Sequence, residues 1–262
     1  MSFGESYTYL FIFVLGASVG SFLNVLIDRL PREEQIFKGR SHCDHCQHKL
    51  SALDLFPIVS WVILRGRCRY CHSPIRWQNP VVELSTGILF VSTFYFFPAG
   101  NTYNLLPNIY YLILISALIA IFVIDLKHQI IPDKIVYPAI LVSLLFLIIN
   151  SKFLILNFLL AALGAALFFA LVIVITAGRG MGWGDVKLVG LMGLFLGFPK
   201  IIVALYLAFL TGSILGVILI LLGKKRFGQN IPFGPFLAGA SIFSIFFGEK
   251  AWQFLVKTLG LV

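Results

Sequence analysis

The sequence has few charged residues. Only 12% of its 262 residues are Asp, Glu, Lys or Arg, whereas soluble domains carry about 25%. Hydrophobic residues make up 59% and the mean hydropathy is +0.96. This composition cannot cover the surface of a soluble protein or keep a disordered chain in solution, and four cysteines are too few for a disulfide-rich secreted scaffold. It predicts an all-α polytopic membrane protein.

Basic residues are also missing before the first apolar run, 7–27, while Arg29 and Arg32 follow it. A cleavable signal peptide has the opposite arrangement. The first run is therefore predicted to be a transmembrane helix.

Eight apolar runs predict about eight transmembrane helices. The run at 186–198 is short for a span of about 20 residues, so it either borrows residues from its flanks or is re-entrant. Glycine pairs at GxxxG spacing either mark close helix packing or occur by chance; they are Gly16/Gly20, Gly193/Gly197 and Gly212/Gly216. The runs are 7–27, 81–98, 109–125, 135–149, 153–177, 186–198, 201–222 and 231–247.

The basic residues fall mainly on one side of these runs. If all eight cross, 16 Lys and Arg lie on one side and four on the other, and the basic side is cytoplasmic. The net charge of +9 then reflects topology rather than nucleic-acid binding. The predicted parts are a first transmembrane helix (1–27), a cytoplasmic domain (28–80), a seven-helix membrane domain (81–248) and a C-terminal tail (249–262), with both termini outside.

All four cysteines lie in the 28–80 segment, as Cys43-x2-Cys46 and Cys68-x2-Cys71 separated by 21 residues. Two such knuckles predict a zinc-ribbon-like tetrahedral site filled by four thiolates, which makes the zinc structural rather than catalytic. A redox pair or unligated thiols are the alternatives. Four histidines near the knuckles could replace a ligand or lie around the site; they are His42, His45, His48 and His72.

Two aspartates are predicted to form a catalytic pair. Asp125 ends the third run and Asp185 precedes the sixth, so both are expected at the cytoplasmic ends of helices, where they could meet. Two carboxyls in one desolvated pocket share a proton. The ionised one can then activate water while the protonated one polarises an amide carbonyl, which is the chemistry of an aspartic protease.

The residues around this pair allow other roles. Gly182 and Gly184 precede Asp185 in a GxGD motif and leave room for an extended substrate. Each aspartate could instead cap a helix or pair with a lysine, Lys127 or Lys187. Asp133 suits an N-cap, and it could also belong with Gly182, Gly184 and Lys187 to the loop that binds the substrate at the site.

The ordered motifs resemble those of the bacterial type IV prepilin peptidases, and the resemblance covers nearly the whole chain. The motifs are Gly20-Ser21-Phe22-Leu23-Asn24-Val25, Arg29-Leu30-Pro31, the two CxxC pairs, Asn79-Pro80-Val81-Val82-Glu83-Leu84, Ile124-Asp125, Ile131-Pro132-Asp133, Gly180-Met181-Gly182-Trp183-Gly184-Asp185-Val186-Lys187-Leu188 and Pro232-Phe233-Gly234-Pro235.

The resemblance implies a membrane aspartic endopeptidase of the bacterial inner membrane with Asp125 and Asp185 as its dyad. It implies cleavage of prepilins or pseudopilins after a Gly, then methylation of the new amine, commonly of Phe, with S-adenosylmethionine. Glu83 could hold the substrate amine in this second reaction or pair with Arg76. Asn24, Asp28 and Arg29 could line the same cleft, and no G-x-G-x-x-G loop marks a cofactor site.

Three other functions compete with this one. A transporter could use the two aspartates as a proton or ion relay, although no inverted repeat is evident. A non-enzymatic assembly protein would explain the cysteines but leave the GxGD motif unused. An intramembrane protease of the signal-peptide-peptidase type would not explain the cytoplasmic cysteine domain.

Overall fold

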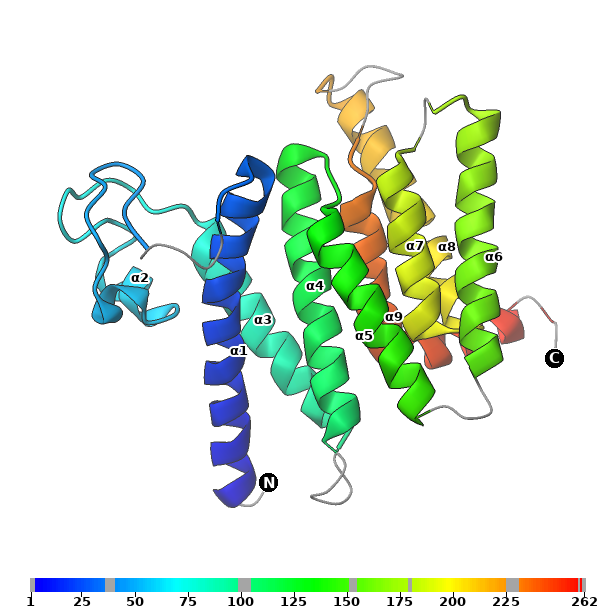
Figure 1. The fold of residues 1–262 in the computed structure, drawn as a ribbon, viewed down its shortest axis with the longest axis horizontal. Coiled ribbons are helices and arrows are strands. Elements are labelled where there is room, and N and C mark those ends of the chain that lie inside the picture. The colour runs from blue at the N-terminus through cyan, green and yellow to red at the C-terminus, as the bar shows by residue number, and fades with distance from the viewer. Residues whose placement is uncertain are drawn as a thin grey trace. The chain divides into compact units, whose positions relative to one another are not determined.

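The computed structural model describes residues 3–35, 41–98, 105–150, 155–178, 181–224, 231–258 and 260. The regular structure of these described residues is helical and contains no strand, apart from two isolated bridges. The chain divides into two compact units, Met1–Ala120 and Ile121–Val262, and the boundary falls inside α4 (Leu106–His128; Figure 1). Gly180 of the motifs and six of the basic residues counted above lie outside the described ranges; the six are Lys38, Arg40, Lys152, Arg179, Lys225 and Arg226.

The first unit is built on two helices that cross closely, α1 (Phe3–Arg29) and α3 (Gln78–Phe96). A Cβ on Gly16 would lie 2.9 Å from the Cα of Gly87, and one on Gly20 would lie 2.7 Å from the Cα of Glu83. Side chains at these positions would hold the helices apart. The packing role predicted for this glycine pair is therefore confirmed.

The segment between α1 and α3 contains only short elements. They are the 3-10 helices η1 (Leu30–Arg32) and η2 (Ala52–Leu55) and the helix α2 (Val59–Ile63). Two isolated bridges, His42↔Lys49 and Arg67↔Pro74, close two small loops. Each loop carries one CxxC pair, so the two knuckles have the same local form.

The second unit packs around α7 (Trp183–Leu196), which contacts α5 (Asp133–Asn150), α6 (Ile155–Ile175), α8 (Lys200–Leu221) and α9 (Gly234–Thr258; Figure 1). Nearly every α7 residue from Leu188 onward is buried. Its short apolar run thus reflects coverage by other helices rather than by lipid. A Cβ on Gly193 would overlap the backbone of Ala161 and Ala162 in α6.

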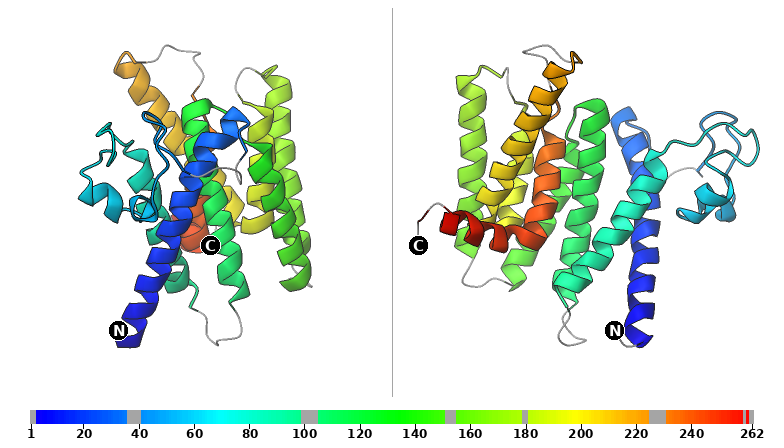
Figure 2. Two further views of the ribbon diagram at one scale, coloured as in Figure 1. Left: turned by 60° about the vertical axis from the view of Figure 1, so that its left-hand side comes forward. Right: turned by 180° about the vertical axis from the view of Figure 1, so that it is seen from behind.

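The last helix, α9, continues to Thr258 and so includes part of the segment expected to be a tail. Its final turns run at a steep angle to its first part (Figure 2). Gly248 is buried there, and a Cβ on it would lie 3.1 Å from the Cγ of Lys200.

Five described helices are long and apolar enough to cross a membrane: α1 with the turn that follows it (Ser6–Arg32), α4, α5, α6 and α8. Each of the eight apolar runs corresponds to one long helix. For α3, α7 and α9, which are shorter or less apolar, crossing stays a prediction. The chain is a multi-pass, all-helical membrane protein.

Candidate active site and metal centre

Asp125 is a buried carboxylate near the end of α4, with 4% of the residue exposed. The backbone N–H of Gly234, the first residue of α9, donates a hydrogen bond to it. Phe233 fixes this helix start, because its ring packs with Phe209 at a centroid distance of 5.1 Å and with Phe169 at 6.3 Å. An aromatic cluster therefore places a helix N-terminus against the carboxylate, where the helix dipole favours negative charge.

Asp185 is held in a similar way. It is the third residue of α7 and is also buried. The backbone N–H of Gly182, which precedes the helix, donates a hydrogen bond of 3.0 Å to its Oδ2. Asp185 thus caps the helix to which it belongs, as the sequence allowed, and is also buried.

The structure brings the two carboxylates into electrostatic interaction within the second unit. Each carboxylate faces the amino end of a helix and accepts one backbone N–H from a glycine. Asp125, Asp185 and Glu83 are buried acidic residues.

The two glycines of the GxGD motif have different surroundings. A Cβ on Gly184 would lie 3.0 Å from the Cβ of Ile131, in the link between α4 and α5. A Cβ on Gly182 would meet nothing closer than Oδ2 of Asp185, at 3.8 Å. Gly184 therefore serves helix packing, whereas Gly182 leaves space beside the carboxylate.

Asp133 and Lys187 pair with each other. The ammonium Nζ of Lys187 donates to both carboxylate oxygens of Asp133, at 2.7 and 2.9 Å, and lies 5.3 Å from the centre of the Tyr137 ring. Asp133 is the first residue of α5 and is half exposed. Lys187 thus partners Asp133 rather than Asp185, and Asp185 is left as an acid without this counter-ion.

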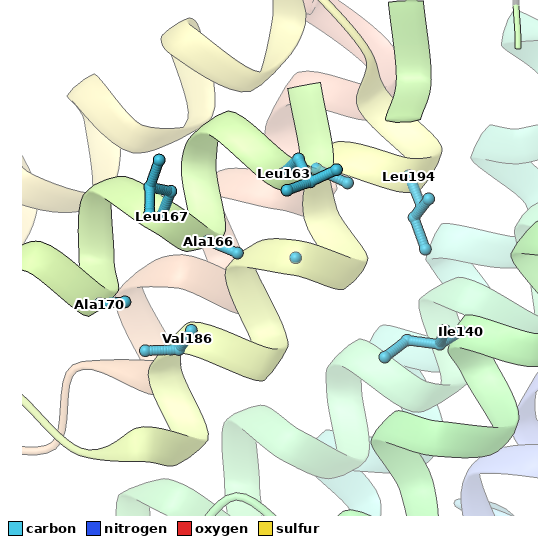
Figure 3. A pocket seen from close by; sticks show the side chains of 9 residues that line it. Ile140, Leu163, Ala166, Leu167, Ala170, Val186 and Leu194 are labelled. Atoms are coloured by element: carbon cyan, nitrogen blue, oxygen red, sulfur yellow. The ribbon is translucent and has the colours of Figure 1, made fainter. Parts of the chain in front are cut away.

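An open apolar groove of about 440 Å³ lies between α5, α6 and α7 (Figure 3). Its walls include Ile140, Ala166, Val186 and Gly190, and neither aspartate lines it. Its lining residues are all apolar, so it offers no group that could take part in hydrolysis.

The four cysteines converge in the first unit. Their Sγ atoms all lie within 4.8 Å of one another, and those of Cys43 and Cys71 are 3.8 Å apart. A tetrahedron of Zn–S bonds of about 2.3 Å has edges of about 3.8 Å. The arrangement fits a four-thiolate metal site. His48 packs against the Tyr70 ring instead, at a centroid distance of 3.7 Å.

The two knuckles have the same pattern of backbone hydrogen bonds, each within its own loop. The amides of Cys43 and Cys68 donate to the carbonyls of His48 and Ser73, at 3.0 and 2.8 Å. The residue after each second cysteine, Gln47 or His72, has a φ of 57°. These turns are what set the paired sulfurs side by side.

The thiols of the cluster differ in pKa, so they would not all be ionised without a metal ion. Burial raises the pKa of the Cys43 thiol, but backbone hydrogen bonds from Cys46 and His45 outweigh it and bring the pKa to about 6. Backbone hydrogen bonding from His48 lowers the pKa of Cys46, yet burial and the neighbouring sulfurs raise it to about 11. A divalent cation would hold all four as thiolates.

Glu83 is a buried residue of α3, and its carboxylate accepts hydrogen bonds from other residues of the protein. Its Oε2 accepts a hydrogen bond of 2.7 Å from the backbone N–H of Ile58, and Ser21 also hydrogen-bonds to the carboxylate. Arg76 instead reaches Asp28 at 3.4 Å and Asp44 at 3.8 Å.

The other junction residues form an amide cluster beside it. The side chain of Asn24 donates to the Asn79 carbonyl at 3.1 Å and accepts from Gln78 at 3.2 Å. This cluster links the ends of α1 and α3.

Sequence reasoning missed the role of Gly234. The Pro232-Phe233-Gly234-Pro235 motif carried no assigned function, yet it places the amide that meets Asp125. A proline in the first turn of a helix is a start signal, and it could have marked this segment as a helix N-terminus.

These features define a polytopic membrane protein with a buried aspartate pair and a separate four-cysteine site. The chain belongs to the type IV leader peptidase family. The family model described as "Type IV leader peptidase family" matches residues 112–217, and "Bacterial Peptidase A24 N-terminal domain" matches residues 14–97.

Several proteins of similar sequence carry the name prepilin leader peptidase/N-methyltransferase. One from Aeromonas hydrophila is 32% identical over 91% of this chain and 90% of its own length. One from Stutzerimonas stutzeri is 33% identical over 90% of each, and one from Bacillus subtilis is 31% identical over 94% of this chain and 97% of its own. No solved structure matches the chain.

Proposed function

We propose that the chain is a membrane aspartic endopeptidase that removes the leader of prepilins and then N-methylates the new N-terminus. The observation that carries the proposal is the buried pair Asp125 and Asp185, each held by a glycine amide at a helix start. Family membership and the names of the relatives support both reactions.

Cleavage requires one carboxylate and one carboxylic acid. The ionised aspartate takes a proton from a water molecule as its oxygen attacks the scissile carbonyl carbon, and the protonated one gives its proton to the carbonyl oxygen. Collapse of the tetrahedral diol breaks the C–N bond, and the departing amine takes a proton. The helix N-termini at Gly182 and Gly234 favour the charge that one carboxylate must keep.

The site is proposed to lie at the cytoplasmic face of the bacterial inner membrane. The excess of Lys and Arg on that side of the apolar runs supports this orientation. A basic leader would then stay in the cytoplasm while the apolar segment after it enters the bilayer, so the bond after the Gly falls at the interface. Prepilins fit this geometry, as do pseudopilins.

We assign methylation to the first unit, which the N-terminal family domain matches at residues 14–97 and which carries the cysteine-bearing loop. S-adenosylmethionine would supply the methyl group: its S–CH3 bond would break as the N–CH3 bond forms, the α-amine would lose a proton and S-adenosylhomocysteine would leave. An α-amine has a pKa of about 8, so positioning matters more than base catalysis. Asn24 and Glu83 would hold the α1–α3 junction in which the amine is placed.

Zinc is proposed to hold the two knuckles together. Cys43, Cys46, Cys68 and Cys71 would fill its coordination shell, so it would order the loop without taking part in either reaction.

The test uses purified protein in detergent with a full-length prepilin. Asp125→Asn and Asp185→Asn are each expected to lose at least about 100-fold in cleavage rate, the contribution of a general acid or base. Glu249→Gln is the matched control, because it makes the same carboxylate-to-amide change at an exposed α9 position. Normal cleavage by either aspartate variant would contradict the dyad.

Methylation is measured separately on prepilin that has already been cleaved. Both aspartate variants are expected to methylate it at the wild-type rate, which shows that they are folded. If a variant loses both reactions, its aspartate cannot be assigned to the cleavage step. If the wild-type protein cleaves no prepilin, the proposed function is wrong.

A further inference from the structure

We propose that residues 52–64, the 52–64 segment, dip into the bilayer beside α1 and present an apolar face to lipid acyl chains. The segment contains η2 and α2. It lies inside the 28–80 domain, which the sequence predicted to be cytoplasmic. The proposal does not depend on the proposed function.

The depth of the segment follows from its contact with α3. The N–H of Ile58 is bound to Glu83, whose Cα lies against Gly20 of α1. Gly20 is about 13 Å along the helix from Arg29 and about 6 Å from Asn24, at 1.5 Å per residue. If either of these polar residues marks the bilayer surface, α2 begins below that surface. Figures 1 and 2 show α2 beside α1 rather than beyond its C-terminal end.

The outward side of the segment is apolar. Ile63 is 71% exposed and Leu53 is 73% exposed. A patch of this kind is costly in water and marks a surface that meets lipid or another apolar partner. The exposed apolar side chains are Leu53, Leu55, Phe56, Val59, Val62 and Ile63.

The single charged residue of the segment is turned inward. The side chain of Asp54 is 3% exposed and accepts hydrogen bonds from Ser51, Arg69 and Tyr70, with Arg69 Nε at 2.6 Å. A charge facing hydrocarbon would be expensive. The segment therefore exposes only apolar side chains on its outer side.

The backbone at the start of α2 is satisfied without water. Ile58 has a φ of 61°, which is unusual for a β-branched residue, and its amide is held by a carboxylate that is itself buried. In lipid every backbone polar group needs such an internal partner. A surface loop could have used water instead.

The flanks of the segment suit a bilayer surface. Arg65 and Arg67 follow it and are exposed, where they can reach anionic headgroups. The Trp61 and Trp77 rings pack at a centroid distance of 4.3 Å, and Trp is enriched at membrane interfaces. Apolar surface, inward charge and basic flanks together favour lipid over a protein partner.

The test is quenching of tryptophan fluorescence by lipids brominated in the acyl chain. The full chain is placed in nanodiscs after all four tryptophans are changed to Phe, and one Trp is returned by Ile63→Trp or Val62→Trp. Leu15→Trp on α1 is the embedded control and Lys49→Trp in the first knuckle is the aqueous control, both at exposed positions. The expected emission loss at 63 and 62 is comparable to that at 15.

A second measurement uses the wild-type protein, so that it does not depend on the variants folding. Hydroxyl radicals generated in water should oxidise Tyr70, which is 43% exposed, and spare Leu53 and Ile63. Oxidation of Leu53 and Ile63 would overturn the proposal. Protection of these residues without quenching by brominated lipid would mean that a protein covers the face, which would overturn it as well.

Discussion

Gly234 and Asp125 are in direct contact: the glycine amide hydrogen-bonds to the carboxylate, and a Cβ on Gly234 would lie 2.6 Å from Oδ2. No side chain fits at this position unless the carboxylate moves. The start of α9 is therefore part of the site, although it is more than a hundred residues from Asp125 in the sequence.

Gly234→Ala is expected to displace the Asp125 carboxylate and lower the rate of prepilin cleavage at least about tenfold, since catalytic groups must keep their geometry closely. Gly164→Ala is the control, because nothing lies within 4 Å of a Cβ there. The measurement is kcat for cleavage, with the thermal midpoint recorded alongside. Wild-type kcat in Gly234→Ala would mean that the contact does not position the carboxylate.

The two glycines of the GxGD motif are expected to respond differently to alanine. Gly184→Ala should destabilise the protein by about 1–3 kcal/mol, because its Cβ would crowd Ile131. Gly182→Ala should fold normally, since its φ of −94° and ψ of 157° suit any residue. If substrate passes beside Asp185, Gly182→Ala raises KM for prepilin without changing the thermal midpoint. An unchanged KM would place the substrate elsewhere.

Asp133→Asn tests whether this aspartate joins the chemistry. Its ion pair with Lys187 is half exposed, and such pairs contribute about 0–1 kcal/mol. We expect cleavage to fall only a few-fold, far less than for Asp125→Asn, and Lys187→Met to behave similarly. A loss as large as that of the dyad variants would make Asp133 a third participant.

Removal of the metal is expected to separate the two reactions. Cys43→Ser and Cys68→Ser should lower the zinc content and loosen the two knuckles, so methylation should fall more than cleavage. Zinc is measured by elemental analysis and the two rates are measured on separate substrates. Zinc content equal to wild type in both variants would contradict the metal site.

The sequence predicted those parts of the molecule that leave a local pattern. Eight apolar runs marked the long helices and CxxC spacing marked the sulfur cluster. Asp125 and Asp185 could be expected to meet, because one lies at the end of a helix and the other at the start of a helix on the same predicted side. The amide of Gly234 and the bond between Ile58 and Glu83 left no such pattern. Both are contacts of a backbone group with a distant side chain, and hydropathy does not record them.

The close packing of α7 on α6 gives a stability prediction. A Cβ on Gly193 would overlap the α6 backbone, whereas one on Gly190 would lie 3.7 Å from the Cβ of Ala166, an ordinary contact at the open apolar groove. Gly193→Ala should therefore lower the free energy of unfolding by about 1–3 kcal/mol or more, and Gly190→Ala should leave it unchanged or raise it, because alanine favours helix. Thermal midpoints in one detergent compare the two. Equal midpoints would mean that α6 can shift away from α7 at little cost, in which case the helix positions around Asp185 are less rigid than the packing indicates.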